Sequence, residues 1–217
     1  MGSFLSLQEM LVRTAEAVRP PERLAVWEAA EKYRHVNNPG SYVGPYDISI
    51  TPYMKEPMEV LSSLEHTGMI FVGPAQCGKS DTSSNWLTYS AICDPADYMH
   101  VDKSQTAARD FYHRRIERLF RDTTELRNRL LPGQKGTSTF TSKFISGMLF
   151  TLSWPTVNEL SGKPVGRIWL ADYDRMDEDI GGEGSAYDLA VNRTKTFGKF
   201  EMNAAESSPS RDIEKPK

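Results

Sequence analysis

Residues 73–80 read GPAQCGKS, and their types and spacing suit the binding of phosphate groups. Gly73, Gly78, Lys79 and Ser80 satisfy the pattern G-x-x-x-x-G-K-[ST]. Such a turn lets backbone N–H groups curl around a phosphate, while the lysine adds a positive charge and the hydroxyl ligates Mg²⁺. We therefore predict a Mg-ATP site. Its expected ligands are Gly73, Pro74, Ala75, Gln76, Cys77, Gly78, Lys79, Ser80 and Asp81.

Hydrolysis of ATP also needs acidic side chains near the metal and the attacking water. The stretch IWLADYD places Asp172 after four apolar residues, which suits a Mg²⁺ ligand at the end of a strand. We predict that Asp172 holds Mg²⁺ and that Asp174 acts as the base. Position 173 is Tyr where such sites usually carry Glu. A shifted register with Asp172 as the base, the acids of DEDIGGEG, and a merely solvated acidic turn therefore stay open.

A run of arginines between residues 104 and 131 offers positive charge for a polyanion. Arg114, Arg118 and Arg121 recur at steps of four and three, so a regular helix would place them on one face. This face is a candidate contact for DNA phosphates, or the source of an arginine that reaches a neighbouring subunit's nucleotide. The alternative is a solvated face paired with Glu117 and Asp122.

The elements that must position these residues can be read from hydrophobic periodicity and turn signals. We predict that residues 1–35 are helical and that residues 36–57 form an ordered loop packed by its aromatic side chains. We expect strands at about 68–72, 98–101, 144–152 (broken by Gly147), 167–171 and 198–204. Helices should follow Lys79 and occupy 104–131, with a turn at LPGQKG. This alternation predicts an α/β fold with a mostly parallel central sheet flanked by helices.

Composition limits the classes of protein. The 217 residues are 39% hydrophobic and 25% charged, with no apolar run long enough to span a membrane. The net charge of −3 means that any contact with nucleic acid is local. Cys77 lies inside the glycine loop, so we expect a reducing, intracellular setting rather than a disulfide with Cys93. The four histidines have no metal-ligand spacing with the cysteines.

An ordered series of motifs resembles the ATPase region of phage terminase large subunits of the GpA type. The series begins with TPYMKEPMEVL, which contains Tyr53, and continues with GPAQCGKSD, FISGMLFTL, NELSGKPVGRIWLADYDRM and NRTKTFGKFEMNAAESSPS. It covers about residues 25–212. The resemblance implies a RecA-like P-loop ATPase core, with Tyr53 among the nucleotide-binding residues. It also implies that ESSPS, with Glu206, Ser207 and Ser208, couples the γ-phosphate state to movement.

The same resemblance implies a motor that uses ATP and Mg²⁺ to drive double-stranded viral DNA into a procapsid. Its expected partners are that DNA, the capsid portal, the small terminase subunit and further copies of the chain in a ring, with no membrane, in the host cell cytoplasm. We expect a lead-in segment at 1–60, the ATPase core at 61–212 and a frayed tail at 213–217, without the C-terminal nuclease domain of the family. Alternatives are another nucleic-acid ATPase of the P-loop class (helicase-like), an ATP-binding assembly protein with little hydrolysis and, least favoured, a small-molecule kinase.

Overall fold

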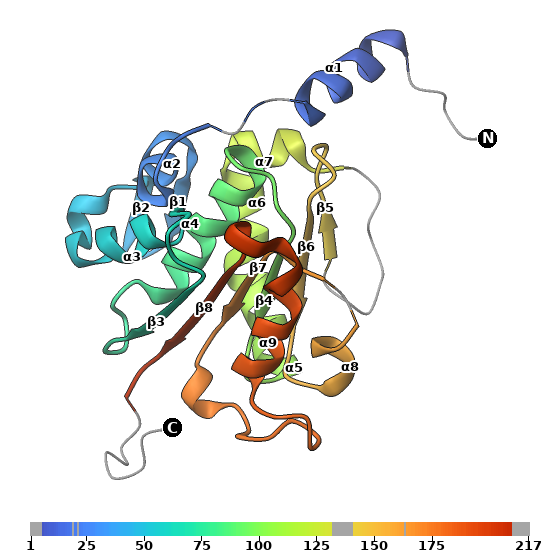
Figure 1. The fold of residues 1–217 in the computed structure, drawn as a ribbon. Coiled ribbons are helices and arrows are strands. Elements are labelled where there is room, and N and C mark those ends of the chain that lie inside the picture. Colours follow the sequence, from blue (N-terminus) through green and yellow to red (C-terminus); the bar gives the residue numbers. More distant parts are fainter. Residues whose placement is uncertain (1–5, 19, 21, 132–140, 163, 210–217) are drawn as a thin grey trace.

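The computed structural model describes residues 6–18, 20, 22–131, 141–162 and 164–209. Its centre is a six-stranded sheet in the order β3-β8-β7-β4-β6-β5 (Figure 1). The strands are β3 (Gly68–Val72), β4 (Tyr98–Val101), β5 (Thr141–Lys143), β6 (Leu149–Ser153), β7 (Arg167–Leu170) and β8 (Met202–Ser207). The first five in spatial order run parallel and β5 is antiparallel to β6. The predicted mostly parallel sheet is confirmed.

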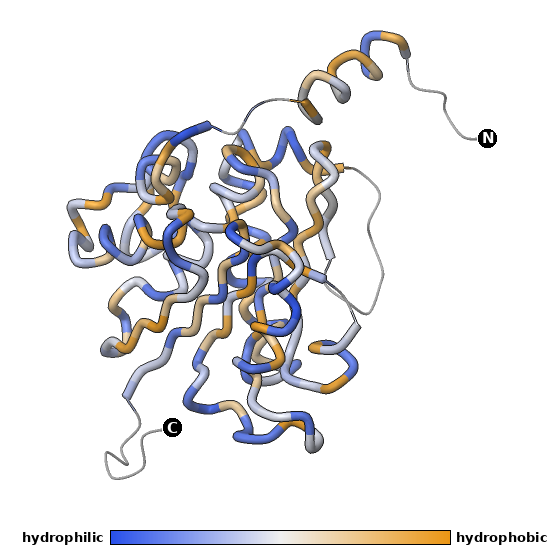
Figure 2. Tube along the Cα trace, viewed as in Figure 1, coloured by the Kyte–Doolittle hydropathy of each residue, from blue (hydrophilic) through white to orange (hydrophobic). Residues whose placement is uncertain are grey.

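Helices cover both faces of this sheet because successive strand side chains point to opposite faces. Tyr98 of β4 packs in a cluster with α2, α4, α6 and α7, whereas its neighbour Met99 packs in a second cluster with α8 and α9. In Figure 2, hydrophobic segments follow β3 and the middle of the sheet. The helices are α1 (Leu7–Ala17), α2 (Val26–Tyr33), α3 (Lys55–Val60), α4 (Lys79–Ile92), α5 (Gln105–Phe111), α6 (Glu117–Asp122), α7 (Thr124–Arg129), α8 (Val157–Leu160) and α9 (Ala186–Thr194).

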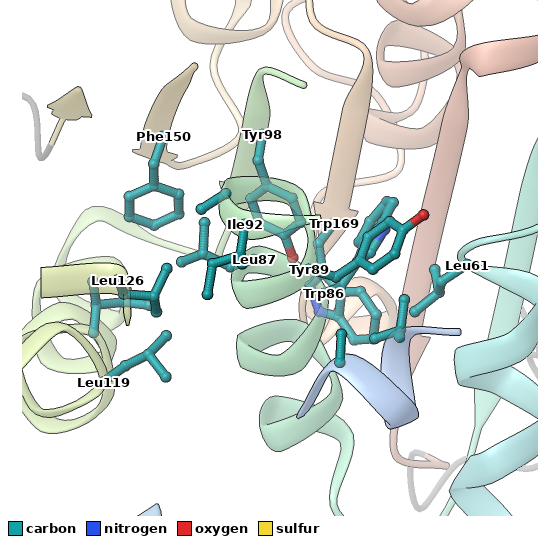
Figure 3. Close-up of a cluster of buried hydrophobic side chains, with 14 of the residues drawn as sticks. Leu61, Trp86, Leu87, Tyr89, Ile92, Tyr98, Leu119, Leu126, Phe150 and Trp169 are labelled. Atoms are coloured by element: carbon teal, nitrogen blue, oxygen red, sulfur yellow. The ribbon is translucent and has the colours of Figure 1, made fainter. Parts of the chain in front are cut away.

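The first cluster contains the largest buried side chains (Figure 3). Trp86 of α4 is fully buried, with its ring centroid 5.0 Å from that of Tyr98 and 6.3 Å from that of Trp169. Most other positions of α4 are small and polar. Thr82 and Ser84 satisfy their buried hydroxyls by donating to backbone carbonyls one turn earlier. The helix that follows the glycine loop is therefore held on nearly all sides, which fixes the loop's position.

The N-terminal region differs from the expected single helical stretch and loop. Two separate helices, α1 and α2, occupy the described part of 1–35, and His35 already begins a strand. The expected loop at 36–57 contains an antiparallel hairpin of β1 (His35–Asn38) and β2 (Tyr42–Pro45), two short 3₁₀ turns and the start of α3. Four-residue strands this polar carry too little alternation to be read from sequence. The proposed boundary at residue 60 stays a prediction.

The basic segment at 104–131 is not one helix. After α5, residues Tyr112–Ile116 form a π-helical turn, and an extended Thr123 separates α6 from α7. Thr123 is buried and its backbone is extended, so α6 ends there and α7 begins as a separate helix. The last strand also begins later than predicted, at Met202, after a 3₁₀ segment at Lys195–Phe200. Most of the expected LPGQKG turn and the tail at 213–217 lie outside the described residues.

Candidate nucleotide-binding site

The carboxyl ends of the five parallel strands lie at one edge of the sheet, where such folds place their ligands. The segments that follow β3, β8 and β7 surround a pocket of about 220 Å³. Residues 75–80 of the glycine loop line one side. Arg115, Asp172, Glu206 and Ser208 complete the lining. The strand order thus brings together the glycine loop, the acidic stretch and the ESSPS segment, although 129 positions separate Lys79 of the loop from Ser208 of that segment.

Two glycines give the loop its shape. A Cβ on Gly73 would lie 2.8 Å from Cε1 of Phe71 and 3.0 Å from the sulfur of Cys77, so only glycine fits without displacing a neighbour. Gly78 has a φ of +91°, a conformation that side-chain-bearing residues rarely adopt. From Gly78 the chain enters α4, and the first N–H groups of a helix lack partners within the helix and favour an anion.

Lys79 is held by oxygen atoms from two strands' ends. Its ammonium donates to the carbonyl oxygens of Gly73 (3.2 Å) and Pro74 (2.8 Å) and to the hydroxyl of Ser208 (2.9 Å). A fourth and longer contact reaches the sulfur of Cys77 at 3.7 Å, so all three protons of the ammonium are in use. The N–H of Gly73 also donates to the carbonyl of Ser207 at 3.1 Å. The phosphate-binding loop and the ESSPS segment are therefore in direct contact.

The acidic side of the site contains two predicted residues and one that sequence reasoning missed. Asp172, in a left-handed conformation with φ of 51°, accepts from the ammonium of Lys103 at 2.7 Å. Glu206 is buried, and its Oε2 has no protein partner among the described residues. Burial and the nearby Asp172 raise the pKa of Glu206 to about 7. Asp102, after β4, also has a pKa that burial raises, to about 6.

The donor set fits a magnesium ion shared with phosphates. Ser80 and Asp172 both line the pocket and offer a hydroxyl and a carboxylate oxygen. The described residues contain no group of three or more His, Cys, Asp or Glu side chains suited to a metal. Mg²⁺ is commonly held by one or two protein oxygens together with substrate phosphates and waters, so two ligands are enough.

Several predicted site residues lie outside the pocket lining. Asp81 faces away, with its carboxylate 2.6 Å from the buried guanidinium of Arg34. Asp174 donates its backbone N–H to the Ser207 hydroxyl at 3.3 Å, and Tyr53 is 54% exposed. Their assigned roles stay predictions.

The three candidate arginines are divided between two places. Arg114 and Arg118 line a small hollow beside β1, together with Arg115. Arg121 instead pairs with the adjacent Asp122 at 2.7 Å. Arg114 also pairs with Asp110, at 2.6 Å. These residues stay candidates for DNA or for a neighbouring subunit.

Sequence reasoning missed four residues at or beside the site: Arg34, Asp102, Lys103 and Arg115. A usable signal existed for two of them, because Asp102 and Lys103 directly follow the predicted strand at 98–101. Arg34 and Arg115 have no such signal. They reach the site through the packing of α2 against α4 and through the π turn.

The sheet order, the glycine loop after β3 and the acid after β7, with β8 between the two strands, define a P-loop ATPase domain with a RecA-like core. The family model described as "Phage terminase large subunit gpA, ATPase domain" matches residues 40–215. This match covers most of the sequence, so the chain belongs to that family, and the resemblance read from the motifs is confirmed.

A solved structure agrees at the level of the fold. The crystal structure of the HK97 bacteriophage large terminase is similar with a TM-score of 0.61 and 11% identity, over 84% of this chain and 37% of that one. The ATPase domain of the Thermus phage P74-26 large terminase has a TM-score of 0.46 and 13% identity, over 66% of this chain and 59% of that one. This chain therefore spans less than two thirds of either of these chains. No curated protein matches the sequence significantly.

Proposed function

We propose that this chain is the motor ATPase of a viral DNA-packaging terminase, which couples Mg-ATP hydrolysis to movement of double-stranded DNA into a procapsid. The observation that carries the proposal is the contact between Lys79 and Ser208. One residue belongs to the phosphate-binding loop and the other to the segment expected to couple phosphate state to movement. A change in the phosphates held by Lys79 would then alter its hydrogen bond to Ser208, directly after β8.

The chain's own residues have distinct tasks in this proposal. Lys79 exchanges a loop or Ser208 oxygen for a phosphate oxygen, because its three protons are already in use. Ser80 and Asp172 would hold Mg²⁺, which neutralises charge on the phosphates when bound. For Asp172 to hold Mg²⁺, its ion pair with Lys103 must break. Asp174 stays the predicted base, and Glu206, which lines the pocket, is a second acid.

The wider assembly belongs to the proposal as well. We place the chain in the host cell cytoplasm, in a homo-oligomeric ring with the capsid portal and the small terminase subunit. Among the described residues, no helix is long and apolar enough to cross a membrane. An arginine supplied by a neighbouring subunit is worth about 10³–10⁵ in rate, so the chain without a ring should hydrolyse ATP slowly.

An ATP-binding assembly protein with little hydrolysis is the second candidate. Its supporting observations are Tyr173, which stands where a catalytic Glu is usual, and Lys103, which pairs with Asp172. A helicase-like ATPase would share the same pocket and differ in its response to DNA.

Steady-state ATP turnover with and without double-stranded DNA tests the proposal. We expect measurable turnover in the wild type, none in Lys79→Ala, and loss of Mg²⁺-dependent turnover in Asp172→Asn. The exposed Lys195→Ala is a control for removal of a lysine. Turnover in Lys79→Ala equal to wild type would make the glycine loop a structural turn, and tight ATP binding without turnover would favour the assembly protein.

A further inference from the structure

Arg115 is a cation of the phosphate-loop pocket that neither the motifs nor the arginine spacing pointed to. Its guanidinium lines the same pocket as residues 75–80 and Asp172. It comes from the π-helical turn Tyr112–Ile116, in which each turn contains an extra residue. Such turns are rare and are frequent at functional sites.

The protein holds Arg115 weakly where it lies. Its Nη1 atom is 3.7 Å from the Asp81 carboxylate and 3.3 Å from the Asn38 side-chain oxygen. Asp81 has a nearer partner in Arg34, whose side chain is 6% exposed and which also bonds the Asp81 carbonyl. The Arg115 side chain remains 35% exposed. Its planar fork is therefore available to another acceptor.

Charge in the pocket favours an anion. Asp81 is paired with Arg34, and Asp172 is paired with Lys103. Of the described lining residues, Lys79 and Arg115 then face one remaining acid, Glu206. The N-terminal end of α4 adds further positive potential.

The position of Arg115 along the pocket indicates which part of a nucleotide it meets. Lys79, Ser208, Asp172 and Glu206 gather at the strand ends, where the lysine of such loops meets the β- and γ-phosphates. Arg115 instead lies beside the first turn of α4, 3.7 Å from the Asp81 carboxylate, and in such sites the N–H groups of the loop that leads into this turn cradle the α- and β-phosphates.

We propose that Arg115 binds the α- and β-phosphates of the nucleotide in its own subunit's pocket, with its guanidinium fork turned from Asp81 and Asn38 onto phosphate oxygens. This inference rests on the proposed function and adds a binding residue to that site. Because the contact is made to phosphates that ATP and ADP share, it supports binding of both nucleotides and contributes nothing specific to hydrolysis.

Equilibrium titrations with fluorescent ADP and with a slowly hydrolysed fluorescent ATP analogue test the inference. We expect Arg115→Ala to weaken both nucleotides by about 10- to 100-fold, as for loss of one hydrogen-bonded charge. Arg115→Lys should recover only part of this affinity, because a point charge does not reproduce the fork. The exposed Arg109→Ala, in the adjoining helix α5, is the matched control and should bind as wild type.

Competition separates phosphate recognition from recognition of the rest of the nucleotide. Pyrophosphate should displace the fluorescent ADP from wild type and do so about 10-fold less well from Arg115→Ala, while displacement by adenosine should change by less than about twofold. Thermal melting of each variant checks that it is folded.

Two results would overturn the inference. One is unchanged ADP affinity in folded Arg115→Ala. The other is weakened ATP binding with ADP affinity retained, which would assign Arg115 to the γ-phosphate. Failure of the proposed function has a different signature, since wild type and Lys79→Ala would then bind nucleotide equally or not at all.

Discussion

The buried carboxyl of Glu206 should make the stability of the chain depend on pH. The residue is 4% exposed, and burial with the neighbouring Asp172 raises its pKa from 4.5 to about 7. The folded chain therefore binds this proton more tightly than the unfolded chain does. Stability from this group is fully present below about pH 4.5 and is lost as pH rises toward 7. The pKa difference corresponds to about 3 kcal/mol.

Glu206→Gln isolates this effect, because the amide keeps the shape and the acceptor oxygen but carries no charge. The two proteins should have similar melting temperatures at pH 5. At pH 8 the variant should melt roughly 6–12 °C higher, from about 2–4 °C for each kcal/mol in a chain of this size. Thermal melts at both pH values, without nucleotide or Mg²⁺, measure the difference.

Asp102, whose pKa burial raises to about 6, is present in both proteins and cancels to first order. The exposed Glu65→Gln is the control for loss of one carboxyl and should give the same shift at both pH values. A gap between wild type and Glu206→Gln that stays constant or shrinks from pH 5 to pH 8 would refute the reasoning.

Three further perturbations test the packing and the charges around the site. Arg34→Met leaves the Asp81 carboxylate without its close partner and should lower the free energy of unfolding by about 3 kcal/mol in urea titrations. Adding Asp81→Asn to this variant should restore part of the lost stability, and a double variant whose loss equals the sum of the two single losses would contradict this. Gly73→Ala brings a methyl group 2.8 Å from the Phe71 ring and should cost about 1–3 kcal/mol in thermal melts, whereas an unchanged melting temperature would mean that the ring moves aside. Replacing three arginines together with Ala should weaken sequence-independent DNA binding and reduce its salt dependence while basal ATP turnover is kept; unchanged DNA affinity would leave them as a solvated surface. The three are Arg114, Arg118 and Arg121.

The sequence alone determined the parts of this protein that are encoded by local spacing. The glycine loop requires one glycine for close packing and one for a positive φ, so a stretch of eight residues is enough to identify it in the sequence. The strands at 68–72, 98–101 and 167–171 are short apolar runs bounded by turn signals, and the structure places β3, β4 and β7 there within one residue. The parallel orientation of the strands then follows from their alternation with helices, because two parallel strands must be joined by a crossover connection, which is usually a helix.

Tertiary structure decided which side chains face the loop. Lys103 meets Asp172 only because β4 and β7 are neighbours in the sheet, since 69 positions separate the two residues in the sequence. Arg34 reaches Asp81 because α2 packs on α4.

Arg115 is the clearest example of a pocket residue that local sequence spacing does not predict and tertiary structure places. A spacing argument that assumes 3.6 residues per turn selects Arg114 with Arg118 and Arg121, and it passes over the residue between them. A π turn at Tyr112–Ile116 changes that spacing and aims Arg115 at the pocket. Arg115 also contacts a segment far away in the sequence, the Asn38 side chain of the β1–β2 hairpin, at 3.3 Å. Local sequence fixes the chemistry of the loop, and long-range packing fixes the charges that surround it.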